Sequence, residues 1–211
     1  MNLFRDQIYK YIKHSHSARG KDLQFKKSRD VFGKGAILSI VNFAENYTFT
    51  LQKEIQSEYC HSDKVSILVH IMYRHAELDV DGFDSNENNR EVIKEYHFYI
   101  SDDRTHDTCF VQHCFGMLYK ELSRRKITFK EHWVWLDGCA GQFKSACSFL
   151  WLSCLHRNTD VHHTWRFFEM GHGKGEQNGA GACMKCALRR YQMNHFASRL
   201  VNSSSGTFKS I

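Results

Sequence analysis

The sequence predicts an α/β fold in which helices flank a mixed five-stranded sheet. Compact runs of β-branched and aromatic residues, bounded by polar or glycine-containing segments, predict five strands. Apolar residues at steps of three and four between the later runs predict helices. A length of 211 residues with 42% hydrophobic content suffices to bury one core. The expected order is three strands, helix, strand, helix, strand and a closing helix.

The expected strands are short apolar runs: Ala36–Phe43, Val65–Tyr73, Val92–Ile100, His132–Leu136 and Thr164–Phe168. The acidic, polar segment Glu77–Asn89 between the second and third runs has the composition of a hairpin loop. Antiparallel pairing of the first three strands is therefore the simplest arrangement.

Three helices are expected after the third strand. Asp102 and Asp103 are acidic enough to bind a metal, but they fit better as the N-cap of a helix of about six turns whose apolar residues reach Leu122. Helical spacing also covers Gln142–Leu155, and the closing helix is expected over Ala182–Leu200.

The chain divides into an N-terminal basic unit, one core and a tail. Residues 1–34 are expected to form a short helix followed by a loose arm, residues 35–200 the core, and residues 201–211 a tail of disordered composition. Lys10–Arg29 holds seven Lys or Arg against one Asp, so this segment alone equals the chain's net charge of +6. Such an arm either neutralises phosphates of a nucleic acid or is a solvated charged segment.

The cysteine pattern does not indicate disulfides. There are eight cysteines, but no apolar stretch follows a basic start in the first 25 residues, so reduced thiols in the nucleus or cytoplasm are expected and secretion is not. Cys183 and Cys186 have a zinc-like spacing without a second pair. Because the pair falls in an expected helix, core cysteines are the favoured interpretation.

Several function classes lack their motifs. No apolar run approaches the roughly 20 residues that a membrane span needs. The chain has no phosphate-binding GxxxxGK[ST], no GxGxxG after a strand and no nucleophile elbow, which disfavours ATPase, dinucleotide-cofactor and serine-hydrolase functions. No membrane partner and no small-molecule cofactor are expected.

Polar residues follow the strands at positions that can meet at one edge of the sheet. Asn42 and Glu45 end the first strand, Asp137 ends the fourth, and Glu176 and Asn178 precede the last helix within a glycine-rich loop. Hard oxygen ligands of this kind suit Mg²⁺ or Mn²⁺. Asp137 is alternatively a plain helix N-cap, and the two glutamates are alternatively surface carboxylates.

Basic residues accompany this edge. Gly171–Gly181 is either a flexible loop or a loop whose backbone approaches a phosphate, with His172 and Lys174 contacting it. The residues expected to contact nucleic acid are Lys144, His172, Lys174, Lys185, Arg189, Arg190 and, in the arm, Lys26, Lys27 and Arg29.

Four segments resemble a family of eukaryotic transposon-derived proteins with a DDE-type, ribonuclease H-like core. They are NFAENYTFTLQKEIQSEYCHS (42–62), YISDDRTHDTCFVQHC (99–114), WLDGCAGQFKSA (135–146) and TWRFFEMGHGKGEQNGAGACMKCALRR (164–190). The resemblance spans about 150 of the 211 positions in the same order. It implies a ribonuclease H-like sheet and an ancestry in DNA strand transfer, with acidic residues that bind Mg²⁺ or Mn²⁺.

The chain departs from that family's acidic pattern at two positions. Asp137 matches, but Asn42 and Asn178 stand where the family has aspartate. An amide offers a neutral oxygen without the charge that attracts two divalent cations, so Glu45 or Glu176 would have to substitute. The resemblance thus favours a DNA-binding, catalytically impaired protein from a domesticated or degenerate transposon. An active metal-dependent nuclease or strand-transferase, and an interaction module without a nucleic-acid role, are the alternatives.

Overall fold

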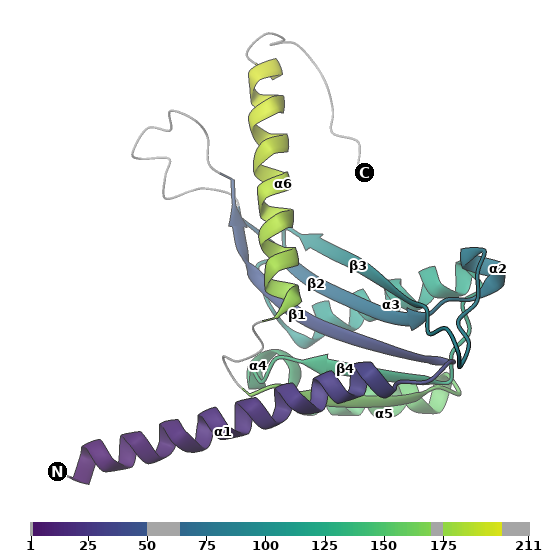
Figure 1. Cartoon of the computed structure of the whole chain (residues 1–211). Coiled ribbons are helices and arrows are strands. Elements are labelled where there is room, and N and C mark those ends of the chain that lie inside the picture. The colour runs from purple at the N-terminus through teal and green to yellow at the C-terminus, as the bar shows by residue number, and fades with distance from the viewer. Residues whose placement is uncertain (1, 50–63, 170–174, 200–211) are drawn as a thin grey trace.

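The computed structural model describes residues 2–49, 64–169 and 175–199, and its centre is one five-stranded sheet (Figure 1). The strands lie in the order β3-β2-β1-β4-β5. Their bounds are β1 Ala36–Thr48, β2 Lys64–His75, β3 Val92–Ser101, β4 Glu131–Leu136 and β5 His162–Phe167. β1 pairs antiparallel with β2, and β2 with β3, whereas β1, β4 and β5 run parallel. The mixed α/β sheet is confirmed.

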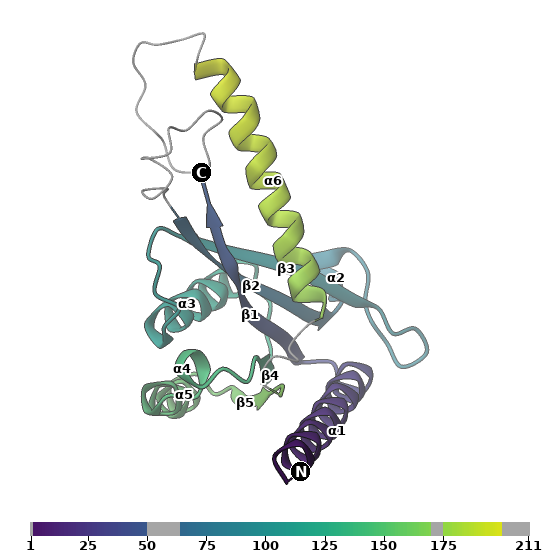
Figure 2. The same ribbon diagram turned by 90° about the vertical axis from the view of Figure 1, so that its left-hand side faces the viewer.

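Helices cover both faces of the sheet (Figure 2). Their bounds are α1 Asn2–Val31, α2 Leu78–Asp81, α3 Thr108–Arg124, α4 Ala140–Phe143, α5 Ala146–Asn158 and α6 Glu176–Arg199. α1 and α6 lie on one face, and α3 and α5 on the other. On the α1/α6 face Phe25 packs with Trp135, and on the α3 face Phe115 packs with Val41.

β1 is buried on both faces because it lies at the centre of the sheet. Its side chains alternate, with Leu38 and Ile40 in the cluster under α1 and α6, and Val41 and Phe43 in the cluster under α3. The run of apolar residues without polar alternation is what a strand buried on both faces requires. The register with β2 is interrupted between Ala44 and Tyr47, where β1 is irregular.

The expectation of a short helix followed by a loose arm was wrong, because α1 is a single helix of 30 residues. Its second half packs on the sheet through Phe25, whose ring lies 5.6 Å from that of Trp135. Ser17 Oγ and Lys21 Nζ donate hydrogen bonds of 2.8 and 2.7 Å to the Glu169 carboxylate, whose pKa Lys21 and Ser17 lower to about 2. These contacts stabilise the helical conformation of a segment for which the charge pattern predicts a loose arm.

Two other helix starts differ from expectation because local side chains cap them. α3 begins at Thr108 rather than after Asp103, since Asp107 accepts a 2.8 Å hydrogen bond from the Phe110 amide. Its 17 residues make it shorter than six turns. The single helix expected over 142–155 is divided into α4 and α5, because Ser145 Oγ accepts from the Ser148 amide and starts a new helix.

The segment expected to be a hairpin loop contains the helical turn α2. Asp81 on this turn receives hydrogen bonds of 2.6 and 2.7 Å from the guanidinium of Arg74, which is buried on β2. The same guanidinium donates at 2.8 Å to Glu95 of β3, and Arg125 also binds Glu95. A buried cation needs such paired carboxylates, so this network fixes α2 against the sheet.

Four histidines form a transverse row on the α3 face of the sheet. His97 of β3 is the cross-strand partner of His70, and His132 of β4 that of His163. Ser39 of β1 joins the two pairs, with Oγ 2.7 Å from His70 Nε2 and 2.8 Å from His132 Nε2. The hydroxyl has one proton, so one of these imidazoles must donate to it and the other accept.

Burial keeps the central histidines neutral. It lowers the pKa of His132 to about 3 and that of His163 to about 4, and it lowers the pKa of His70 well below the usual value. Neighbouring histidines add to the effect because their charges would repel. The row is thus a set of polar side chains that the fold accepts only in the uncharged form.

We expect stability to fall between pH 6.5 and about 4.5. An unfolded histidine, with a pKa of 6.5, binds a proton in this window that the folded His70, His132 and His163 do not bind. The free energy of unfolding should therefore drop by up to ~1.4 kcal/mol per pH unit for each histidine. Urea denaturation at several pH values measures this slope.

Two variants identify the source of the slope. His163→Gln should reduce it by about a third, whereas His113→Gln, which changes an exposed histidine of α3, should leave it unchanged. Urea midpoints that do not move with pH in the parent protein would contradict the assignment of neutral buried histidines.

Candidate functional site

Asn42 and Asp137 are brought together by the register of two parallel strands. Val41 of β1 pairs with Leu136 of β4, so the next residue on each strand is Asn42 and Asp137. Ile40 and Trp135, two residues earlier, belong to the core cluster under α1 and α6. Side chains two residues apart on a strand share a face, so both polar side chains project toward that same face.

Asn178 is exposed in the first turn of α6, which begins at Glu176 and not at Ala182 as expected. Gly181, one turn after Asn178, lies against β1 and β2: an ideal Cβ on it would be 3.1 Å from Ala44 Cβ and 3.5 Å from Val69 Cγ2. Val69 is the cross-strand partner of Asn42. α6 therefore passes beside Asn42 at Gly181, whereas its first residue, Glu176, bonds to Tyr73 of β2.

Asp137 does not cap a helix. Its Oδ1 accepts a 2.7 Å hydrogen bond from the Gly138 amide, and the N-cap of α4 is Cys139. The carboxylate is half-buried at the end of β4, with a second oxygen that this contact leaves available. The N-cap interpretation of Asp137 was therefore wrong.

Glu176 forms a charged cluster with residues of α1, β2 and β3 at the start of α6. It accepts a 2.5 Å hydrogen bond from Tyr73 of β2, pairs with Lys94 of β3, and lies 3.9 Å from Arg29 of α1. Burial alone would raise the pKa of Glu176, but the hydrogen bonds from Lys94 and Tyr73 outweigh it and lower that pKa. This carboxylate joins α6 to β2, β3 and α1.

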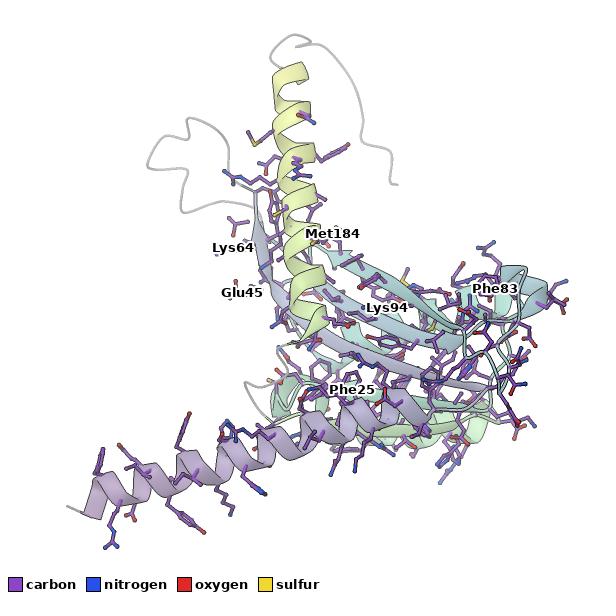
Figure 3. All side chains as sticks on the ribbon, viewed as in Figure 1. Phe25, Glu45, Lys64, Phe83, Lys94 and Met184 are labelled. Carbon is purple, nitrogen blue, oxygen red and sulfur yellow. The ribbon has the colours of Figure 1, made fainter. Side chains whose placement is uncertain are left out.

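Glu45 lies on the opposite flank of α6 from Lys94 (Figure 3). Its side chain is 96% exposed, and its nearest cation is Lys185 of α6 at 3.6 Å. A carboxylate so fully hydrated at the strand irregularity pairs weakly with a lysine and is free to move. Neither glutamate that was expected to substitute for a lost aspartate is held toward Asp137.

The residues at this edge do not fit two divalent cations. Among the described residues, no group of three or more His, Cys, Asp or Glu side chains is placed to hold a metal ion. The register places one carboxylate, Asp137, beside one amide, Asn42, and Asn178 of α6 is a second amide. Two neutral oxygen donors do not supply the charge that a pair of Mg²⁺ or Mn²⁺ ions requires.

The basic residues expected to contact nucleic acid have different environments. Three of them form ion pairs: Lys26 with Asp22, Arg29 with Glu176 and Lys185 with Glu45. Lys27, Lys144, Arg189 and Arg190 are exposed, and Lys144 Nζ lies 4.8 Å from the Phe167 ring centroid. His172 and Lys174 lie outside the described residues, as does the tail 201–211.

The cysteine pair on α6 does not belong to the core. Cys183 and Cys186 are both exposed, which corrects the expectation that helical placement would bury them. The inward face of α6 instead packs Ala180, Met184 and Leu188 against the core cluster, together with the buried Gln177, Gly181 and Gln192. No helix in the described part of the chain is both long enough and apolar enough to cross a bilayer.

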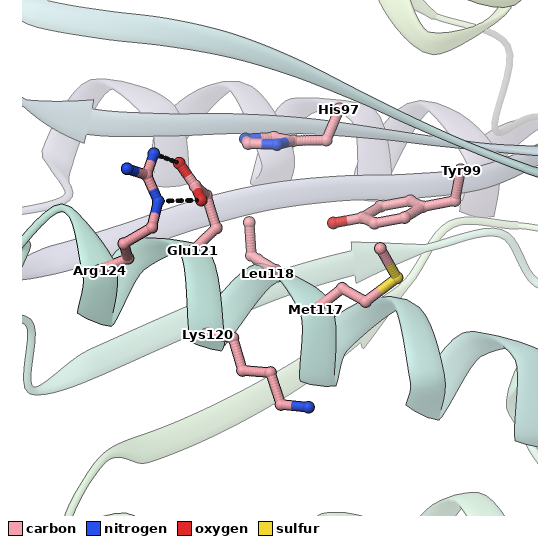
Figure 4. Close-up of a pocket in the computed structure, with 7 residues that line it drawn as sticks. All are labelled: His97, Tyr99, Met117, Leu118, Lys120, Glu121 and Arg124. Atoms are coloured by element: carbon pink, nitrogen blue, oxygen red, sulfur yellow. Dashed lines mark hydrogen bonds and ion pairs between the residues drawn. The ribbon is translucent and has the colours of Figure 1, made fainter. Parts of the chain in front are cut away.

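A pocket that the sequence did not indicate lies between β3 and α3 (Figure 4). Its volume is about 420 Å³. The residues that line it come from one strand and one helix: His97, Tyr99, Met117, Leu118, Lys120, Glu121 and Arg124. β3 and α3 come together only in the folded chain, so no local sequence pattern indicates this pocket.

Fold and site together define an α/β protein with a polar cluster, poor in carboxylates, at the end of two parallel strands. The chain belongs to a family described as a domain of unknown function, DUF8701, whose model matches residues 21–211. None of the curated proteins matches the chain.

We expect Gly181→Val to destabilise the protein by ~1–3 kcal/mol, because the added side chain would overlap Ala44 and displace α6 from the sheet. Gly179→Val is the matched control, since an added Cβ there has no heavy atom within 4 Å and valine favours a helix over glycine. Thermal and urea unfolding compare the two. Equal losses of stability would show that α6 does not depend on this close approach.

Proposed function

We propose that the chain is a DDE-type transposase-derived protein whose ribonuclease H-like domain binds DNA and is catalytically impaired. The sheet order β3-β2-β1-β4-β5, with three antiparallel strands followed by two parallel ones, is compatible with such a core. The resemblance of the segments around Asn42, Asp137 and Asn178 supplies the ancestry.

The observation that carries this proposal is that the β1–β4 register makes Asn42 and Asp137 neighbours at the end of two parallel strands. The two residues are 95 positions apart in the chain, and α6, which bears Asn178, packs through Gly181 on Ala44 and Val69 beside them. Strand ends and the helix start above them commonly form the site in α/β folds.

The impairment follows from electrostatics. In a two-metal site the carboxylates neutralise the cations and hold them about 3.5–4 Å apart. Among the described residues, Asp137 is the carboxylate beside Asn42, while Glu176 is committed to Tyr73 and Lys94 and the exposed Glu45 lies 3.6 Å from Lys185. The protein therefore keeps a surface that DNA can approach without the charge that phosphoryl transfer requires.

Two alternatives remain distinct from this proposal. A metal-dependent nuclease or strand-transferase would need Glu45 to move toward Asp137 when a cation binds, and Glu45 is sufficiently exposed for such a movement. An interaction module without a nucleic-acid role would bind neither DNA nor Mg²⁺. The next two experiments separate all three.

We expect DNA affinity that falls steeply with salt. If two phosphates are neutralised, raising NaCl from about 50 to about 300 mM should weaken binding about 25-fold through counterion uptake. Lys27→Glu and Arg190→Glu should each weaken binding several-fold at the lower salt. Arg157→Glu on α5, on the far face of the sheet, is the control and should have little effect. Absence of binding at low salt would favour the interaction module.

We expect the double variant Asn42→Asp, Asn178→Asp to acquire Mg²⁺- or Mn²⁺-dependent DNA nicking that the parent lacks. The two substitutions add the missing negative charge beside Asp137, and addition of Asp137→Ala should abolish the acquired activity. Gel assays of supercoiled plasmid and calorimetry with Mn²⁺ measure nicking and ion binding separately. Nicking by the parent would support the active nuclease, and failure of the double variant to bind Mn²⁺ would refute the convergence of the three positions.

A further inference from the structure

β3 is an edge strand without the usual protection against strand addition. It pairs with β2 through ten consecutive residues, Val92–Ser101, with no break in register. The chain contains no proline, and edge strands are normally guarded by proline, bulges or free charges. No further strand pairs with the other side of β3 in the described part of the chain.

The charges on β3 are occupied elsewhere and do not guard the edge. Lys94 pairs with Glu176 of α6, and Glu95 accepts from Arg74 at 2.8 Å and from Arg125 at 2.5 Å. Burial alone would raise the pKa of Glu95, but the hydrogen bonds from Arg125 and Arg74, with His97 3.6 Å away, outweigh it and keep the carboxylate ionised. Both side chains are thus held against their own sheet.

The β3–α3 pocket adjoins this open edge. His97 and Tyr99 reach from the α3 face of β3, while one flank of α3 supplies the opposite wall (Figure 4). On that flank Leu118 is buried, and Met117 is 48% exposed although apolar. A strand added to β3 would lie over this flank of α3, and its alternate side chains would point at the pocket.

We propose that the β3 edge and this pocket bind an extended peptide segment of another protein. The peptide adds a sixth strand through its backbone, and one aliphatic side chain enters the pocket against Met117 and Leu118. Lys120, exposed on the same flank, favours a carboxylate in the peptide next to that side chain. Glu121 is already paired with Arg124 at 2.7 and 2.9 Å, so Lys120 is the cation available.

A second copy of the chain fits this surface less well than a foreign peptide. If two copies paired with His97 opposite His97, another Glu95, His97 or Tyr99 would lie over the pocket, and none of these residues is aliphatic; Ile93 would reach it only in a different register. Polar groups would then lie against the apolar floor of the pocket, and their loss of hydration would cost free energy. This inference is independent of DNA binding, because the pocket lies on the α3 face and the polar cluster on the α6 face.

The test selects dodecapeptides from a random display library on the full chain. We expect enriched peptides to alternate in polarity, with an aliphatic residue beside an aspartate or glutamate. Amide hydrogen exchange should slow at outward-facing amides of β3 when the synthetic peptide binds. Met117→Glu and Lys120→Glu should each weaken binding at least about tenfold, the latter because it repels the peptide's carboxylate.

Leu150→Glu is the matched control, since Leu150 is an exposed apolar residue of α5, 66% exposed, and binding should not change. Circular dichroism confirms that each variant is folded. The proposal is overturned if selection yields no binder, if the binders tolerate Met117→Glu, or if the β3 amides exchange at the same rate with and without peptide. A shift to dimers that blocks peptide binding would instead identify the second copy as the occupant.

Discussion

The structure depends on β1, which is buried on both faces and hydrogen-bonded on both edges. Its antiparallel pairing with β2 and its parallel pairing with β4 make the sheet mixed, and its alternating side chains separate the two apolar layers. Because β4 ends at Leu136 while β1 continues to Thr48, Asn42 and Asp137 meet where the shared register stops. The position of the polar cluster is thus a consequence of the unequal lengths of two strands.

All five strands could be predicted from the sequence because each is a compact apolar run between breakers, and burial of such runs is a local property. The helix ends were less predictable, since capping depends on one side chain: Asp107 rather than Asp103 starts α3, and Ser145 starts α5. The length of α1 depends on contacts with Glu169 and Trp135, more than a hundred residues away. No window of sequence contains that information.

The candidate site was predictable as a set of positions and not as a set of environments. Strand order indicated that residues near 42 and 137 would approach one another, which the β1–β4 register confirms, while the approach of residue 178 stays a prediction. The contacts of Glu176 with Tyr73 and Lys94 arise between elements that are distant in the chain, so its withdrawal from the cluster was not visible. The histidine row was missed for the same reason, because single histidines on separate strands have no spacing to recognise.

The two halves of α1 differ in what holds them. From His14 onward the helix contacts Glu169 and the sheet, whereas Phe4, Tyr9 and Tyr11 are each at least 70% exposed on a segment that projects from the body (Figure 1). The docked half supplies the costly nucleus of helix formation, and the outer half extends it one residue at a time. The outer half of α1 should therefore unwind before the docked half. The peptide bonds that follow Arg5, Lys10 and Lys13 are then the first that a trypsin-like protease can cleave while the rest of the molecule stays folded.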